Sequence, residues 1–242
     1  MPDFPTIDDC LFCKAGRSPN DEMAWHDRPI MQVQQIGAGI PGLGAFVPGY
    51  VLLFPEMHVH SMLLLPPPIR ALFRAFQREV LKLVSREFGP VTVFEHGTCA
   101  SRDGRRSACL SHAHVHIIPG FYDLSQHVAL PREAESSGPA ASPQVLARSG
   151  YIYVHEPGGK PLYGRDPDIS QYFRRRIADF LGIADEWDYL LFPRLSNVKE
   201  TVDRLSSHLE SRTGEVPFTP DEMSPPRLPH QIWTPLDGEG AA

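Results

Sequence analysis

The sequence lacks several features that would place it in a specialised class of protein. It contains no run of about 18 apolar residues, so no membrane-spanning helix is predicted. Residues 1–10 show neither the positive charge nor the apolar stretch of a secretory signal. We therefore expect a cytoplasmic protein, in which the four cysteines serve as thiols or metal ligands rather than as disulfides.

Basic residues are fewer than acidic residues. The chain has 23 basic and 29 acidic residues and a formal net charge of −6. Proteins that bind nucleic acids or membrane surfaces depend on a basic face, so neither partner is expected. A small anionic ligand remains compatible, because a few local arginines suffice for it. With 42% hydrophobic and 10% aromatic residues, the chain can bury a core and is not expected to be disordered.

Apolar strands and one long helix are predicted between residues 24 and 121. Apolar residues at i, i+3, i+4 spacing from Ile69 to Phe88 predict the helix, which starts after Pro66-Pro67-Pro68 and ends at Gly89. Strands are expected at 30–36, 50–54, 91–95 and 109–118. Several connections are too short for parallel crossovers, so the pattern favours an α+β fold, an antiparallel sheet with a long covering helix.

Four segments follow from the composition along the chain. Residues 1–122 form the first predicted domain, and residues 123–150 are small, polar and proline-rich, which is typical of a flexible linker. Residues 151–215 are expected to form an α+β extension with a hairpin at 151–163. In this extension, Asp168 is expected to cap a helix that ends at Leu181, and Asn197 to open the last helix. Residues 216–242 form a proline-rich, extended tail.

Histidine is concentrated in one part of the chain, with six of the 11 residues lying between positions 58 and 116. His112, His114 and His116 alternate with apolar residues. On a strand, this period places the three imidazoles on one face. A solvated face is disfavoured, because no other polar residue lies between them. Imidazole can act as a metal ligand, as an acid or base, or as a nucleophile toward phosphorus.

Cys10 and Cys13 have the spacing of a metal clip. One histidine of the triplet and one distant histidine would complete a closed, tetrahedral and structural Cys₂His₂ zinc site. A redox role is disfavoured, because it needs a strand-to-helix context that residues 1–20 do not provide.

Residues 37–42 match the Gly-x-Gly-x-x-Gly pattern of dinucleotide-binding proteins. That pattern has meaning only where it opens a helix after a strand. Further glycines and prolines up to residue 49 leave no room for such a helix. We interpret the segment as a flexible binding or lid loop.

Four of these motifs together resemble the histidine-triad (HIT) superfamily. Residues 112–118 resemble its His-φ-His-φ-His-φ-φ signature, and residues 10–14 resemble its zinc clip. Residues 48–58 resemble the strand before its long helix, and residues 94–97 a turn found in a bacterial branch. A weaker similarity links residues 170–175 and 187–188 to the C-terminal extension of some bacterial members.

The resemblance implies hydrolysis at the α-phosphorus of a nucleotide anhydride or phosphoramidate. His114 matches the nucleophile that forms a covalent nucleotidyl-histidine, and His116 would hold an oxygen or the leaving group. Transferases of the family carry Gln at the third position, so His116 favours a hydrolase. A nucleotidyltransferase and a non-catalytic nucleotide-binding module remain the alternatives. The acidic charge disfavours the DNA-end-processing role of one branch.

The resemblance also implies the metal ligands, Cys10, Cys13, His58 and His112, around a structural zinc ion. His60 competes with His58, and the Pro-x-x-His spacing favours His58. A homodimer is common in the family, although no interface can be identified in the sequence.

Phosphate donors are expected in the loop from residue 98 to residue 111. Candidates are Arg102, Arg105, Arg106, Ser107 and Ser111, while Cys109 stands where many members have a phosphate-binding Ser. The family's ribose-binding Asp is missing, because residues 32–48 contain no carboxylate. Gln34 or Gln35, or another part of the chain, would have to replace it. The role of residues 174–176, three arginines on a predicted helix, stays open.

Overall fold

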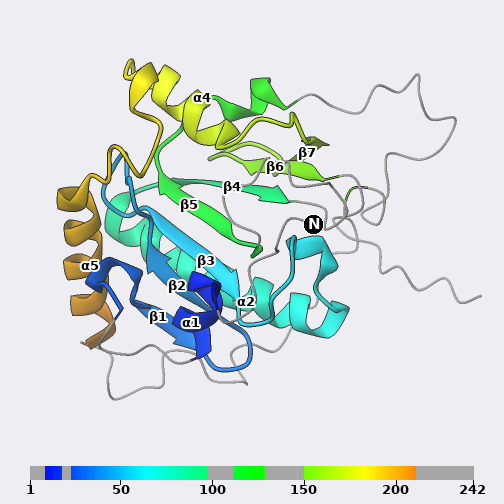
Figure 1. Cartoon of the computed structure of the whole chain (residues 1–242), viewed down its shortest axis with the longest axis vertical. Helices are drawn as coiled ribbons and strands as arrows, with labels where there is room; N and C mark the ends of the chain where they lie inside the picture. Colours follow the sequence, from blue (N-terminus) through cyan, green and yellow to red (C-terminus); the bar gives the residue numbers. More distant parts are fainter. Residues whose placement is uncertain (1–8, 18–22, 98–111, 129–145, 147–149, 211–242) are drawn as a thin grey trace, which may run out of the picture.

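The computed structural model describes residues 9–17, 23–97, 112–128, 146 and 150–210. Seven strands form one antiparallel sheet in the order β1-β2-β3-β5-β4-β6-β7 (Figure 1). The strands are β1 (Met31–Val33), β2 (Gly37–Pro41), β3 (Val51–Pro55), β4 (Val91–Gly97), β5 (Val115–Pro119), β6 (Tyr151–His155) and β7 (Leu162–Arg165). The expected α+β class with an antiparallel sheet is confirmed.

The long helix α2 (Pro67–Phe88) covers one face of the sheet. It starts at Pro67, because proline is well suited to the first turn of a helix, and ends before Gly89, whose φ is 93°. Its buried residues pack against the strand residues that point to the same face. This core includes Phe73, Phe76, Val80 and Val84 of α2 with Val51, Leu53, Val93, Val115 and Ile117 of the sheet.

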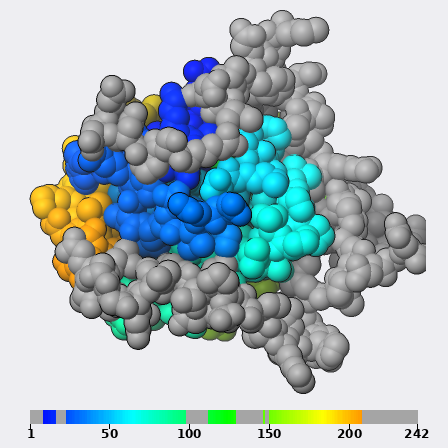
Figure 2. Space-filling view, turned by 90° about the horizontal axis from the view of Figure 1, so that it is seen from below, coloured from blue at the N-terminus to red at the C-terminus, as the bar shows by residue number. Residues whose placement is uncertain are grey.

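Shorter helices cover the opposite face. In α1 (Leu11–Arg17), Phe12 stacks on Phe54 with the ring centroids 4.4 Å apart. In α4 (Tyr172–Phe180), Phe173 packs on Phe94 of β4 at 5.1 Å. The last helix, α5 (Leu195–Glu210), contacts both α2 and β2. In Figure 2, α5 (orange) and the cyan segment around residue 60 flank the blue N-terminal strands.

The remaining helical segments are 3-10 helices: η2 (Trp25–Asp27), η3 (Met62–Leu64), η4 (Leu124–His127) and η6 (Ala184–Glu186). None of the described helices is long and apolar enough to cross a membrane.

The segment expected to be a flexible loop is instead the buried strand β2, so that prediction is wrong. All five residues of β2 are buried between β1 and β3. A Cβ at Gly37 would lie 2.4 Å from the carbonyl oxygen of Phe54, and one at Gly39 would lie 2.9 Å from Cγ of Met31. The glycines therefore permit close packing, and large neighbours fill the space that their missing side chains leave.

The strand expected at 109–118 is shorter. β5 begins at Val115, so only His116 of the three histidines lies in the strand. The backbone N–H of Ala113 donates to Val59 O at 2.7 Å, outside the β3–β5 ladder. Residues 112–114 thereby follow the segment after β3, and His112 turns toward the N-terminal helix.

The predicted hairpin at 151–163 is confirmed, and it belongs to the same sheet as strands β1 to β5, because β6 pairs with β4. Residues 123–128, at the start of the expected linker, are folded: Leu124 is fully buried and its backbone N–H donates to Glu156 at 2.8 Å. Residues 129–145 and 147–149 of that segment and the tail lie outside the described residues. The proposed division into domains stays a prediction.

Two predicted helix caps are wrong. Asp168 has a positive φ of 58° and lies before α4, whose N-cap is Gln171. Asn197 lies inside α5, and its amide donates to Ala45 O and Phe46 O instead of capping the helix. Both side chains lie near a helix start in the sequence, but contacts with the rest of the protein decide their roles.

Candidate functional site

Four side chains predicted as metal ligands converge between α1, the segment after β3 and the segment before β5. The ligand atoms of Cys10, Cys13, His58 and His112 all lie within 4.8 Å of one another. The Sγ atom of Cys13 is 3.2 Å from Nδ1 of His58 and 3.5 Å from Nδ1 of His112. Neighbouring S and N ligands of a tetrahedral zinc ion are separated by about 3.6 Å, given the usual bond lengths. The cluster therefore fits a metal ion such as zinc.

The orientation of His112 supports this arrangement. Its Nε2–H donates to the carbonyl oxygen of Pro55 at 2.8 Å, which leaves the lone pair of Nδ1 on the side of the thiols. Metal-binding histidines usually have such a hydrogen bond on the second ring nitrogen, because it fixes the tautomer. His112 is buried, so the cluster is closed to solvent on this side.

His114 is held by the backbone of its neighbour. Its Nδ1–H donates to His112 O at 2.8 Å, so Nε2 carries the lone pair. The ring of Phe12 contacts it edge-on, at a centroid distance of 5.2 Å. Burial lowers the pKa of His114 to about 4, and the hydrogen bond to His112 offsets only part of this effect. The imidazole is therefore neutral at pH 7, as a nucleophile must be.

His116 lies beside His114, with the ring centroids 4.7 Å apart. Its Nδ1 is hydrogen-bonded to the hydroxyl of Tyr50 at 2.7 Å, and its ring stacks on Phe94 at 4.3 Å. Burial, followed by the nearby His114 and Arg174, holds the pKa of His116 well below its usual value. This second imidazole is also neutral, and Tyr50 fixes its orientation.

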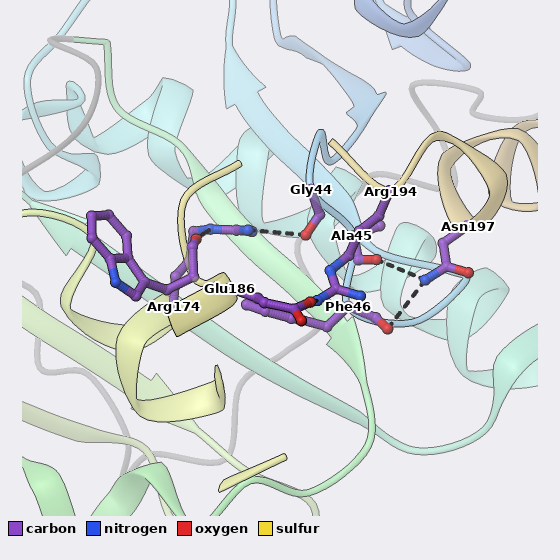
Figure 3. A network of polar contacts seen from close by, with 8 residues as sticks. Gly44, Ala45, Phe46, Arg174, Glu186, Arg194 and Asn197 are labelled. Carbon is purple, nitrogen blue, oxygen red and sulfur yellow. Dashed lines mark hydrogen bonds and ion pairs between the residues drawn. The ribbon is translucent and has the colours of Figure 1, made fainter. Parts of the chain in front are cut away.

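Arg174 of α4 brings positive charge to the same place. It is buried, with 4% of its surface exposed, and its guanidinium donates to Gly44 O at 3.0 Å and to Trp187 O at 2.9 Å. Figure 3 shows this link between α4 and residues 44–46, which Asn197 of α5 also binds. Within the described residues, Arg174 forms no ion pair with a carboxylate, so its charge can serve an anionic ligand.

A small pocket joins these groups. Its lining includes His96, His114 and His116 on the side of the sheet and Gln171, Phe173 and Arg174 on the side of α4. The catalytic histidines predicted from the sequence therefore share one pocket with an arginine, 58 residues or more away in the chain.

Most of the other predicted binding residues lie in a segment that the structure does not describe. Arg102, Arg105, Arg106, Ser107 and Ser111, together with Cys109, lie outside the described residues. Gln34 lies exposed in the turn between β1 and β2. Their roles in binding stay predictions.

Three participants were not predicted from the sequence: Tyr50, Arg174 and the hydrogen-bonded pair of His96 and Asp166. The motif that contains Tyr50 predicts only a strand, although a buried tyrosine hydroxyl needs a polar partner. Arg174 is one of three consecutive arginines, and only the packing of α4 distinguishes it from the other two.

Comparisons with known proteins add the following findings. The sequence matches no family model and no curated protein. Solved structures similar to parts of this chain include a Hit-like protein from Bartonella henselae, with 20% identity and a TM-score of 0.30. That match covers 36% of this chain and 65% of the other. A HIT family hydrolase from Clostridium thermocellum has 17% identity and a TM-score of 0.33, with 48% of this chain and 93% of that one covered.

A hypothetical histidine triad nucleotide-binding protein from Sulfolobus tokodaii has 14% identity and a TM-score of 0.39. This match covers 87% of the present chain and 100% of the other. All three carry histidine-triad names, and their TM-scores lie between 0.30 and 0.39.

Proposed function

We propose that the protein is a nucleotide hydrolase of the HIT type, which acts at the α-phosphorus of a nucleotide anhydride or phosphoramidate. The observation that carries the proposal is the fixed tautomer of His114. Because Nδ1–H is bound to His112 O, the free lone pair lies on Nε2 of a neutral imidazole in the pocket. A histidine held in this way is a competent nucleophile toward phosphorus.

In this mechanism, Nε2 of His114 attacks the phosphorus in line, the bond from phosphorus to the leaving group breaks, and a covalent nucleotidyl-histidine forms. Water then attacks the phosphorus, the bond to His114 breaks, and the nucleoside monophosphate is released. His116, with Nδ1 bound to Tyr50, donates from Nε2–H to a non-bridging oxygen as negative charge develops there. Arg174 adds a fixed positive charge beside the phosphate in a desolvated site.

Cys10, Cys13, His58 and His112 would hold the zinc ion. A closed tetrahedral site of this kind is structural, so zinc would supply the coordination that ties α1 to the segment before β5. The chain's own contribution to catalysis is the position of His112, whose carbonyl oxygen orients His114. A cytoplasmic location and a homodimer stay expectations from the sequence.

The proposal is tested with a panel of nucleotide anhydrides, phosphoramidates and adenylyl sulfate, using the wild-type protein and His114→Ala. Turnover that depends on His114 supports it; equal turnover of both proteins, or none by either, contradicts it. The rival transferase is separated by challenging the covalent intermediate with phosphate or a metabolite acceptor. Discharge that is faster with an acceptor than with water would identify a transferase.

A further inference from the structure

A third imidazole, His96, lies in the pocket with His114 and His116. It comes from β4, whose residue Phe94 pairs with His116 of β5. His96 follows Phe94 by two residues and therefore lies on the same face of β4. The three imidazoles thus line one pocket on this face of the sheet.

Asp166, directly after β7, holds His96 in place. Nε2 of His96 and Oδ1 of Asp166 are 2.9 Å apart, and the two side chains are only 9% and 2% exposed. The same oxygen accepts the backbone N–H of Asp168 at 2.8 Å. Gly150 lies against the carboxylate, since a Cβ there would come within 2.8 Å of Oδ2. The carboxylate is therefore fixed, and its hydrogen bond with Nε2 fixes the orientation of the imidazole beside it.

We propose that His96, oriented by Asp166, is the acid–base residue of this site. This inference rests on the proposed chemistry at His114. In the first step, Nε2 of His114 bonds to phosphorus while the bond from phosphorus to the leaving atom breaks. The leaving atom keeps the electron pair and takes a proton from His96.

The second step reverses the role of His96. A water oxygen bonds to phosphorus, and the bond between phosphorus and His114 breaks with its electron pair returning to Nε2. The proton lost by the water goes to His96, which is then ready for the next cycle. No other reactant is needed, because the proton given to the leaving group is recovered from water.

The surroundings of His96 agree with this role. Charged or titratable groups that face it are Asp166 after β7, His114 and His116 from the β5 side, and Arg174 from α4. β6 places the apolar Ile152 opposite it in the sheet. Among the described histidines of the pocket, His96 is the one hydrogen-bonded to a carboxylate, while His114 and His116 are bonded to a carbonyl and to a hydroxyl.

The test compares two substrates that share one nucleotidyl group. The 4-nitrophenyl ester has a leaving group that departs without a proton, whereas an alkyl phosphoramidate releases an amine that needs one. We expect His96→Gln to lower cleavage of the phosphoramidate about 10²-fold to 10⁴-fold. The first burst of nitrophenol from the ester should stay within about tenfold of the wild-type rate, followed by slow turnover because the second step lacks its base.

Asp166→Asn keeps a hydrogen-bond acceptor for His96 and removes the charge, so it provides a second variant if His96→Gln does not fold. It should lose at least about tenfold on the phosphoramidate and keep the burst on the ester. His155→Gln is the matched control, because His155 lies on the face of the sheet opposite to His96. It should leave both rates unchanged. Equal losses on the two substrates, or no loss on either, would overturn the role of His96. Absence of a burst that depends on His114 in the wild-type protein would instead refute the proposed function.

Discussion

The backbone carbonyl of His112 accepts a hydrogen bond from Nδ1 of His114 at 2.8 Å, while the imidazole of His112 lies in the Cys₂His₂ cluster. One residue is therefore shared between the candidate metal centre and the support of the proposed nucleophile. Cys10 and Cys13 lie about 100 positions earlier in the chain and reach His114 through this residue. Loss of the metal should consequently disturb the orientation of the His114 imidazole, although His114 is not itself a metal ligand.

The first prediction concerns the metal. We expect one equivalent of zinc per chain by elemental analysis, and its loss in Cys10→Ser, because a thiolate is removed from a four-ligand site. The variant should unfold at a lower temperature and show a lower kcat. His60→Ala is the control, since His60 is outside the cluster, and it should retain the metal. A metal content near zero in the wild-type protein would refute the site.

The second prediction concerns Arg174. Replacing it with Met removes the buried positive charge of the pocket and should raise the KM for the nucleotide by about tenfold to a hundredfold. The loss of hydrogen bonds to Gly44 O and Trp187 O should also lower stability. Arg176→Ala is the control, because Arg176 pairs with Asp179 near the surface. Steady-state kinetics with equal KM values for Arg174→Met and the control would contradict a role in binding.

The third prediction concerns Glu95, which is buried on the α2 face and accepts the backbone N–H of Met62 at 2.9 Å. Burial raises the pKa of Glu95 to about 7. The unfolded chain therefore loses this proton at lower pH than the folded protein does, and stability falls as the pH rises from about 4.5 to 7. Glu95→Gln keeps an acceptor for Met62 and removes this dependence.

Urea denaturation at pH 5 and pH 8 measures the difference. Above pH 7 we expect the Glu95→Gln variant to be more stable than the wild type by up to about 3 kcal/mol, and near pH 5 the two should differ little. Glu79→Gln, on the exposed side of α2, is the control and should change stability little at either pH. A wild-type protein whose advantage over Glu95→Gln grows with pH would contradict the assignment.

Local sequence patterns predicted those parts of the structure that local interactions determine. The apolar spacing identified α2, because one stripe of a helix must face the core. The spacing of Cys10 and Cys13 indicated a metal clip, and the alternation of histidines placed His114 and His116 close together. His58 and His112 were indicated as the other two ligands only by the resemblance to the histidine-triad superfamily. These features depend on short stretches of chain, in which geometry follows directly from the residue types.

The errors arose where distant residues decide the structure. Gly37 and Gly39 are typical of a loop, but they lie in strand β2, where Phe54 and Met31 occupy the space beside them. Asn197 resembles a helix cap, but its amide binds the loop at residues 45 and 46. Arg174 and the pair of His96 with Asp166 could not be found from spacing, because only the packing of α4 and β7 brings them to the pocket.

The most direct test of the account is the mass of the protein during turnover. After rapid acid-free quenching of the wild-type protein with a nucleotide substrate, we expect one nucleotidyl group per chain, on the peptide that contains His114. His114→Ala should show neither this adduct nor turnover. Turnover that persists in His114→Ala, or a wild-type adduct on a different residue, would contradict the assignment of His114 as the nucleophile.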